Sequence, residues 1–400
     1  MTDFSSLPLR SLFLKHVAQT SPSPPMLEVE RAEGIFIYDT SGKRFIDFIS
    51  GISVSNTGHR HPKVIAAIKD QLDRYLHVIV YGEFVQNPQV QLAARLAEIL
   101  PDPLDAVYFV NSGSEATEGA LKLAKRFTGR SGIVAFRNAY HGSTHGALSV
   151  MGNEFFKQAF RPLLPDVSIV DFNDFASLDR ISETTACVIV ETFQGEAGAV
   201  IPEYSWLKAL REKCTSTGSL LILDEIQSGF GRTGKFFAFE HAGIIPDILL
   251  IAKGMGGGLP IGAFVASREH MQALTNEPVL GHITTFGGNA VCCAAALANL
   301  DVILQERLVE QVGEKEALIR RTIVHPSILR INGKGLLLAV VFENAQLAMK
   351  VMESCYEKGL ITDWFLFADN CLRISPPLTI TMEELEMACR VFLAACGAVE

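Results

Sequence analysis

From about residue 105 to residue 300, short apolar runs of strand length alternate with stretches whose apolar residues recur at helical spacing. Strands that alternate with helices in this way form a mostly parallel sheet covered by helices. We therefore predict an α/β fold whose ligands bind beyond the carboxyl ends of the strands. The predicted strands cover residues 107–110, 133–136, 187–190, 220–223 and 248–251.

The length of the chain predicts more than one domain, because 400 residues exceed what a single hydrophobic core usually serves. Hydrophobic residues make up 48% of the chain, which excludes wholesale disorder. We expect an N-terminal segment (1–60) that contributes to the small domain, a large domain (61–300) and a small α+β domain (301–400). Within them, we expect a hairpin over 34–48 and helices over 63–76 and 88–100.

Composition excludes several classes of partner. The net charge is −9 and no basic block interrupts it, so neither nucleic acid nor an anionic membrane is expected. The longest clean apolar run, 336–342, is too short to span a bilayer, and the N-terminus lacks the apolar core of a secretory signal. The eight cysteines form no CxxC pair, which favours a reduced, cytoplasmic protein.

One lysine stands at the end of a predicted strand. Lys253 follows the apolar run 248–251, and the glycine-rich segment 254–258 comes directly after it. A lysine in partly apolar surroundings loses some preference for its charged form, so its free amine can attack a carbonyl. The glycines leave room for a bulky group against the backbone. The alternative is a solvated lysine before a flexible loop.

An aspartate stands at the end of the preceding predicted strand. Asp224 opens the segment DEIQSGFGRTG, which covers residues 224–234. A lysine and a carboxylate at neighbouring strand ends suit pyridoxal phosphate, since the lysine forms a Schiff base and the acid keeps the pyridine nitrogen protonated. The alternative is a buried ion pair between Asp224 and Lys253.

These segments resemble the class III pyridoxal-phosphate aminotransferases, a family that contains ornithine, acetylornithine and 4-aminobutyrate enzymes. The resemblance extends over residues 34–377. It implies a large domain of the aspartate-aminotransferase-like type with pyridoxal 5'-phosphate as cofactor. Intact Asp224, Lys253 and Arg373 argue against a catalytically silent regulator. The absence of GxxxxGK[ST] and of an early GxGxxG argues against a nucleotide-binding protein.

A phosphate site is expected where residues 111–115 open a helix after a strand. Serine and glycine at a helix start leave backbone N–H groups free, and that end of the helix attracts anions. The resemblance implies that Gly113 and Ser114 are the phosphate contacts, although a plain N-cap is the alternative. It also implies that Tyr140 stacks on the cofactor ring, with core packing as the alternative. Gln227 is expected near the ring hydroxyl.

A carboxylate and an arginine that lie far apart in the sequence are predicted to control substrate binding. Glu196 follows the predicted strand 187–190, and the resemblance pairs it with Arg373. Arginine can bind a carboxylate through two parallel hydrogen bonds. In this interpretation Glu196 masks Arg373 when an ω-amino substrate is bound, and moves aside for the α-carboxylate of the second substrate. A permanent structural salt bridge is the alternative.

The segment 281–289 resembles a phosphate-binding loop that one subunit donates to its neighbour. The resemblance implies that Thr285 makes this contact, with Thr284 beside it at the substrate, and therefore implies a homodimer. A loop threonine that caps the helix beginning near residue 290 is the alternative. The roles of Tyr81 and His141 stay open, and metal binding by His59 and His61 is not expected because no further ligand cluster lies nearby.

The substrates follow from the resemblance. The family implies a ping-pong transfer from an ω-amino donor of the acetylornithine or ornithine type to a 2-oxo acid, 2-oxoglutarate. Ser143 stands where those enzymes commonly carry an arginine that binds the donor's α-carboxylate in the acetylornithine enzymes. A diamine, 4-aminobutyrate or another ω-amino acid is therefore an alternative donor. An intramolecular aminomutase of the same fold is a further alternative.

Overall fold

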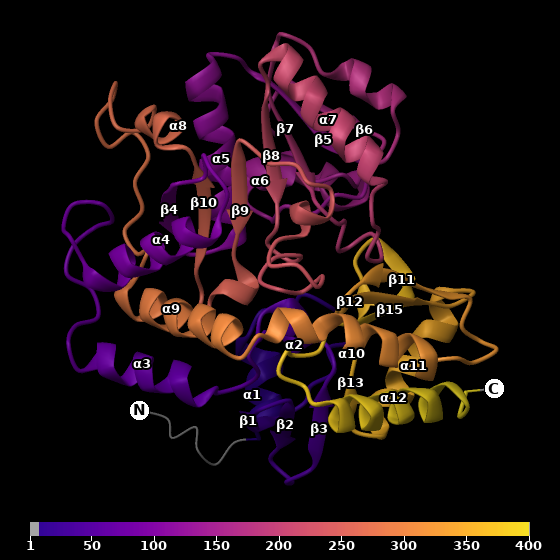
Figure 1. Cartoon of the computed structure of the whole chain (residues 1–400). Coiled ribbons are helices and arrows are strands. Elements are labelled where there is room, and N and C mark those ends of the chain that lie inside the picture. Colours follow the sequence, from indigo (N-terminus) through magenta and orange to yellow (C-terminus); the bar gives the residue numbers. More distant parts are fainter. Residues whose placement is uncertain (1–7, 400) are drawn as a thin grey trace.

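The computed structural model describes residues 8–399, so residues 1–7 of the predicted N-terminal segment lie outside the described part. A central sheet with its helices occupies the upper part of Figure 1. Its elements, in chain order, are β4 (Ala106–Val110), α5 (Gly113–Thr128), β5 (Gly132–Phe136), α6 (His145–Ser149), η1 (Glu154–Phe156), η2 (Gln158–Phe160), β6 (Val167–Val170), η3 (Ala176–Arg180), β7 (Thr185–Glu191), α7 (Tyr204–Thr217), β8 (Leu220–Asp224), η4 (Ala238–His241), β9 (Ile248–Ile251), η5 (Lys253–Met255), β10 (Gly262–Ala266) and α8 (Arg268–Gln272).

The central sheet has seven strands in the order β4-β10-β9-β8-β7-β5-β6. Neighbours from β9 to β6 are parallel, whereas β10 runs antiparallel to both β9 and β4. All five predicted strands are present, and the predicted α/β fold with a mostly parallel sheet is confirmed. Two strands were not predicted. Strand β10 (GAFVA) is rich in small residues and carries little strand signal, whereas β6 (VSIV) has a strand-forming composition but is only four residues long.

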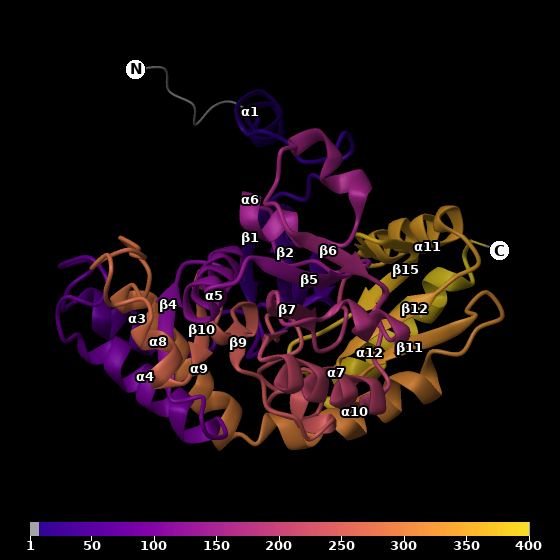
Figure 2. The ribbon, with the colours of Figure 1, turned by 90° about the horizontal axis from the view of Figure 1, so that it is seen from above.

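Successive residues of each central strand face opposite sides of the sheet and join different cores. In β8, Ile222 packs in the cluster that α5 completes, whereas Leu221 and Leu223 pack in the cluster that contains Trp206 of α7. Helices therefore cover both faces, as Figure 2 shows from above. This double burial explains why the strands read as continuous apolar runs. It also leaves the carboxyl ends of the strands as the place where polar side chains can gather.

The remaining strands form two smaller sheets, of order β1-β2-β3-β13 and β11-β12-β15-β14. In the first, Leu360 of β13 pairs in parallel with Ile46 of β3, so the N-terminal segment joins the C-terminal part in space. The remaining elements are α1 (Leu9–His16), β1 (Val29–Glu33), β2 (Phe36–Asp39), β3 (Arg44–Asp47), α2 (Ser50–Ser53), α3 (Pro62–Leu72), α4 (Asn87–Ile99), α9 (Ala290–Gln305), α10 (Leu308–Thr322), β11 (Arg330–Lys334), β12 (Leu337–Val341), α11 (Ala345–Glu357), β13 (Leu360–Ile361), β14 (Trp364–Phe365), β15 (Ala368–Ile374) and α12 (Met382–Cys396).

Local predictions agree with the structure except near the N-terminus. Strands β2 and β3 form the expected hairpin, and α4 matches the helix expected over 88–100. Helix α3 ends at Leu72 rather than near residue 76, because its last apolar residues are exposed and a longer helix would gain no core contact. Helix α1 was not predicted, and none of its residues is buried. The three domain boundaries stay a prediction. Among residues 8–399, no helix is long and apolar enough to cross a membrane.

Candidate active site

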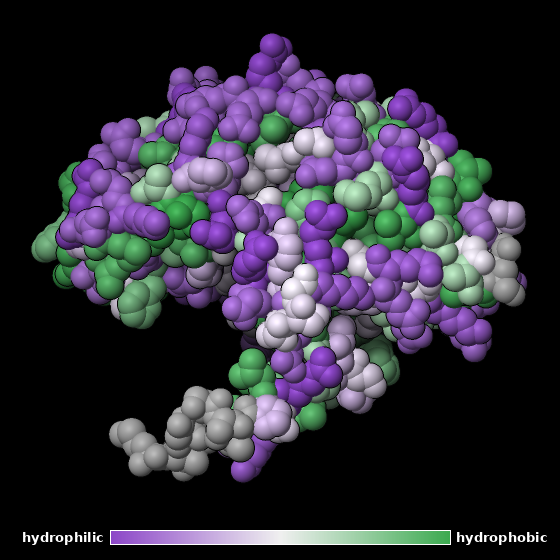
Figure 3. Space-filling model, turned by 90° about the horizontal axis from the view of Figure 1, so that it is seen from below, coloured by the Kyte–Doolittle hydropathy of each residue, from purple (hydrophilic) through white to green (hydrophobic). Residues whose placement is uncertain are grey.

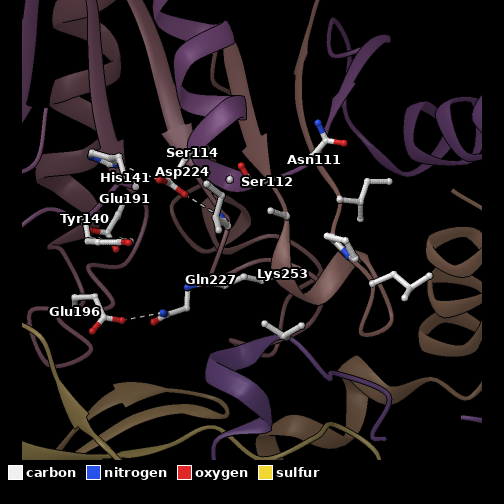
Figure 4. A pocket seen from close by; sticks show the side chains of 18 of the residues that line it. Asn111, Ser112, Ser114, Tyr140, His141, Glu191, Glu196, Asp224, Gln227 and Lys253 are labelled. Atoms are coloured by element: carbon white, nitrogen blue, oxygen red, sulfur yellow. Dashed lines mark hydrogen bonds and ion pairs between the residues drawn. The ribbon is translucent and has the colours of Figure 1, made fainter. Parts of the chain in front are cut away.

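A cavity of about 460 Å³ opens beside the start of α5 and the carboxyl ends of β7, β8 and β9. Figure 4 shows the side chains that converge on it from these elements. Seven of the predicted site residues lie around it: Gly113, Ser114, Tyr140, Glu196, Asp224, Gln227 and Lys253. The sequence therefore predicted a group of residues that the fold brings together around one cavity. Their individual roles stay predictions.

Lys253 lies directly beyond β9, where its backbone turns into a left-handed conformation with φ of 39°. Burial lowers the pKa of its amine, and the charge of nearby Arg373 lowers this pKa further, while Glu196 opposes the shift. A lowered pKa increases the fraction of free amine, which is the form that attacks a carbonyl. Lys253 lines the cavity, and this position favours a reactive amine over a solvated lysine before a flexible loop.

Asp224 is almost completely buried, and its carboxylate is held from two sides. Oδ2 lies 2.7 Å from Nδ1 of His141, and Oδ1 accepts a hydrogen bond of 2.9 Å from the backbone N–H of Ile226. Among residues 8–399, Asp224 forms no ion pair with Lys253, so that alternative is wrong. The position of His141, left open by the sequence, is now known. It lies behind Asp224 and orients the carboxylate.

Glu191 is a lining residue to which the sequence gave no role, because nothing in its motif separates it from Glu196. Its two oxygens accept hydrogen bonds from the backbone N–H groups of Tyr140 (2.9 Å) and Gly195 (2.8 Å). Burial raises its pKa to about 7. Glu191 therefore fixes the loop that carries Tyr140 against the end of β7.

The start of α5 forms one wall of the cavity. The predicted N-cap exists, since Ser112 Oγ accepts a hydrogen bond of 3.2 Å from the N–H of Glu115. Capping and anion binding are compatible, because other N–H groups of the first turn keep no partner within the helix. Gly142, with φ of 122°, packs against this turn, and a Cβ there would come within 2.1 Å of Ser114 Oγ. Only glycine lets the loop approach so closely.

Arg373 lies at the mouth of the site, in a second cavity of about 470 Å³ that also touches Tyr140, Glu196 and Lys253. Its Nη2 lies 3.0 Å from Glu196, as predicted, and its Nε lies 3.0 Å from Asp363. Gln227 joins this network: its Oε1 accepts from Arg373 at 3.3 Å and its Nε2 donates to Glu196 at 3.2 Å. Figure 4 shows the latter contact as a dashed line between Glu196 and Gln227. Asp363 was missed, because no sequence motif surrounds it.

Three predicted residues lie outside both cavities. The hydroxyl of Ser143 is 3.2 Å from that of Tyr140. Thr284 Oγ1 accepts a hydrogen bond of 3.4 Å from Asn111 Nδ2. Thr285 is exposed on the surface. A residue donated to a neighbouring subunit must lie outside the cavity of its own chain, so this position is compatible with its predicted role, which stays a prediction.

The paired histidines near the N-terminal sheet have local partners. His59 Nε2 lies 2.8 Å from Asp47, and His61 lies 3.6 Å from Glu306. Within the described range 8–399, no three His, Cys, Asp or Glu side chains come together as a possible metal site.

Known proteins resemble this chain over nearly its whole length. A family model described as aminotransferase class-III matches residues 17–396. The chain is a class III aminotransferase. It is 41% identical to the acetylornithine aminotransferase of Methanopyrus kandleri over 361 residues, which cover 89% of this chain and 90% of that one. It is 39% identical to the Archaeoglobus fulgidus enzyme of the same name, over 95% and 98% of the two chains.

Solved structures of aminotransferases share the fold. The ornithine aminotransferase of Toxoplasma gondii superposes with a TM-score of 0.91 at 30% identity, covering 98% of this chain and 94% of that one. An (S)-enantioselective omega-transaminase from Thermomicrobium roseum superposes with a TM-score of 0.90 at 29% identity over both full chains. This class III aminotransferase is a pyridoxal-phosphate-dependent transaminase, and pyridoxal 5'-phosphate is its cofactor.

The lining of the cavity fits that cofactor. An amine of lowered pKa, a buried carboxylate and a helix start that favours anions match its aldehyde, pyridine nitrogen and phosphate. When bound, the cofactor supplies the electron sink that transamination requires. In this arrangement Lys253 would hold the aldehyde, Asp224 the pyridine nitrogen, and Gly113 with Ser114 the phosphate, and these roles stay predictions.

Proposed function

We propose that this class III aminotransferase moves the terminal amino group of an acetylornithine- or ornithine-like donor to 2-oxoglutarate in a ping-pong cycle. The observation that carries the proposal is the shared wall of the two cavities, where Lys253 and Glu196 lie between Asp224 and Arg373. The names of the relatives support the donor class. A screen of donors with 2-oxoglutarate as acceptor tests it, with glutamate formation as the readout.

In this proposal each polar group of the site has one task. The amine of Lys253, once freed from the cofactor, moves the proton between the reacting carbons. Asp224 holds a proton at the pyridine nitrogen, and His141 keeps its carboxylate in place. Arg373 binds the α-carboxylate of the 2-oxo acid through two parallel hydrogen bonds. Tyr140 stacks on the ring.

The pair formed by Glu196 and Arg373 is proposed to distinguish the two half-reactions. Glu196 also accepts a hydrogen bond of 3.1 Å from the N–H of Leu366, so its closed position is well supported. Asp363 continues to hold Arg373 when Glu196 leaves. The pair can therefore open without leaving a buried guanidinium alone, which favours a switch over a permanent bridge.

Replacement of Glu196 by alanine is expected to leave Arg373 open in both half-reactions. The enzyme then accepts α-amino groups, such as that of glutamate, about 10-fold faster relative to ω-amino groups, since one charge-assisted contact no longer competes. Single-turnover rates with glutamate and with N-acetylornithine measure this ratio. Glu203→Ala, at the exposed start of α7, serves as the control. An unchanged ratio contradicts the switch.

Two alternatives concern the substrates. Ser143 supplies no cation for a donor carboxylate, and the similarity to an omega-transaminase favours a diamine, 4-aminobutyrate or another ω-amino compound as second choice. An aminomutase of this fold needs no separate oxo acid. A strict requirement for 2-oxoglutarate in the donor screen excludes it.

We further propose a homodimer in which Thr285 completes the phosphate site of the neighbouring subunit. Exposed apolar side chains lie at the end of α3, on the loop that follows it and on the loop that carries Thr285: Leu72, Leu76, Val78, Phe84, Val85, Val279, Leu280, Ile283 and Phe286. Figure 3 shows apolar side chains gathered at the left edge, where α3 and the following loop lie. The loops contact each other, since Tyr81 donates to Thr284 O at 3.3 Å. An apolar surface of this kind favours burial against a second copy.

Mixing two inactive variants tests both the dimer and the donated threonine. Lys253→Ala and Thr285→Asp are each expected to be inactive, the second because its carboxylate repels the phosphate. After the two are unfolded and refolded together, half of the dimers are mixed and each mixed dimer has one intact site, so about a quarter of the wild-type activity returns. If Thr285 serves its own subunit, no activity returns.

The cytoplasmic location stays a prediction, which cell fractionation tests.

A further inference from the structure

A second arginine of the segment 224–234 lies in the interior without a role in the proposed reaction. Arg232 is completely buried, and its guanidinium donates to the carbonyl oxygens of Leu336 (3.3 Å) and Pro376 and to the side chains of Ser50 (3.2 Å) and Asn56. Among residues 8–399 it forms no ion pair with a carboxylate. Burial lowers its pKa to about 9. Burial of such a group costs free energy, so we expect its contacts to serve a function beyond stability.

The contacts of Arg232 reach the segment that carries Lys253. Asn56, which accepts from Arg232, donates from Nδ2 to Phe230 O at 3.0 Å. The same amide packs under Gly254, where an added Cβ would come within 2.4 Å of Nδ2. The next residue, Thr57, donates to Asn299 at 2.8 Å, and Asn299 donates to Gly254 O at 2.8 Å. The peptide that follows Lys253 therefore rests on residues 56–57.

The contacts of Arg232 also reach the strand that carries Arg373. Ser50, a second partner of the guanidinium, donates to Ser375 O at 2.6 Å, and Ser375 Oγ donates to Ile49 O at 3.0 Å. Ser375 follows Arg373 by two residues, and Pro376, a third partner, is the next in the chain. The end of β15 is therefore tied to residues 49–50 and to Arg232.

The turn between these contacts has an unusual backbone. Residues 50–53 all have positive φ, of 45°, 60°, 64° and 61°, although only Gly51 is a glycine. A left-handed conformation is unfavourable for a β-branched residue such as Ile52, so surrounding contacts must hold it. Gly51 and Ile52 line the cavity that contains Arg373. The shape of this wall therefore depends on the hydrogen bonds at its two ends, at Ser50 and Asn56.

We propose that Arg232 and Asn56 are positioning residues that set the separation between the amine of Lys253 and the guanidinium of Arg373. This inference rests on the proposed function, in which Arg373 binds the α-carboxylate of the 2-oxo acid and is masked while the ω-amino donor reacts. Loss of either positioning residue then impairs the 2-oxo-acid half-reaction. Thr57 and Asn299 still hold Gly254 in both variants, and the donor half-reaction needs Lys253 but not the guanidinium of Arg373, so it is spared.

The test uses the holoenzyme forms of Arg232→Lys and Asn56→Ala. Lysine keeps the charge but cannot reach four acceptors, and Asn56→Ala leaves three partners for Arg232, so that variant is expected to fold. Arg320→Met is the matched control, because Arg320 also donates to two backbone carbonyls, those of Ile331 (2.8 Å) and Gly333 (2.6 Å), away from the site.

Single-turnover measurements give the rate and apparent Kd of each half-reaction, with 2-oxoglutarate on one side and N-acetylornithine and 4-aminobutyrate on the other. In both variants we expect kcat/KM for 2-oxoglutarate to fall about 30-fold, since displacements of an ångström can cost a hundredfold. The donor half-reaction and the affinity for pyridoxal phosphate are expected to stay within about 3-fold of wild type. Amide exchange is expected to rise in residues 49–56 of the variants and to stay unchanged in Arg320→Met.

Equal losses in the two half-reactions, or no selective loss in either variant, overturn the inference. If Arg232→Lys does not fold, the half-reaction rates of Asn56→Ala alone test the inference. Failure of the proposed function has a different signature, because the wild-type enzyme then transfers no amino group between these substrates. If the wild-type enzyme transfers the amino group but the variants show no selective loss, the proposed function holds and only the positioning role is refuted.

Discussion

Replacement of Lys253 by alanine is expected to abolish amino transfer, with a loss of about 10⁴-fold or more in kcat. In the proposed mechanism the variant loses both the covalent attachment point and the base that moves the proton, and no other amine lines the two cavities in the described chain. The wild-type protein is expected to be yellow and to retain cofactor after borohydride reduction. The variant is expected to release its cofactor on gel filtration after the same treatment.

Lys315→Ala provides the control for this experiment. Lys315 is a second buried lysine whose pKa burial lowers, to about 8, but its amine donates to Leu378 O and Gln311 rather than facing a cavity of the active site. Its replacement is expected to lower the stability of the protein and to leave its yellow colour and its turnover unchanged. If Lys315→Ala rather than Lys253→Ala removes the attached cofactor, the assignment of the attachment site is wrong.

Replacement of Asp224 by asparagine is expected to lower kcat about 10³-fold, the size of effect seen when one electrostatic contact to developing charge is removed. An amide cannot hold a proton at the pyridine nitrogen by charge, so the cofactor becomes a weaker electron sink. The hydrogen bond to His141 and the bond from the Ile226 N–H keep the side chain in place. Cofactor binding is therefore expected to change less than turnover.

The control for Asp224→Asn is Asp247→Asn. Asp247 accepts hydrogen bonds from Arg211 (2.8 Å) and from the N–H of Leu221 (2.7 Å), which lies at the opposite end of β8 from Asp224. Its replacement is expected to change stability without changing the rate per folded enzyme. Steady-state rates in both variants, normalised to bound cofactor, decide the matter. Equal kcat in Asp224→Asn and wild type would refute the role of the aspartate.

The sequence predicted the fold and the main charged and polar residues of the lining, because both depend on local patterns. Buried strands read as apolar runs, and the polar residues that follow them must gather at one edge of the sheet, which brought Asp224 and Lys253 together. Glycine at position 142 is explained only by the structure, since the approach of its loop to Ser114 is a tertiary contact. Helix α1 carried no usable signal because it buries none of its residues completely.

The sequence did not predict the residues that act through contacts with distant parts of the chain. Asp363 binds Arg373 from a short connection between strands, and nothing in its local sequence distinguishes it from a surface acid. Arg232 stood in a recognised motif, yet its four buried partners come from three separate parts of the chain. Such networks follow from packing rather than from periodicity. Thr285 remains a prediction because its proposed ligand belongs to another subunit.

The most direct test of the central claim is peptide mass spectrometry of the wild-type enzyme after borohydride reduction. The reduced cofactor adds a fixed mass to the amine that carries it. We expect that mass on the single peptide that contains Lys253, at a stoichiometry near one per chain. Its appearance on another lysine, or on none in protein that is fully active, would contradict the account.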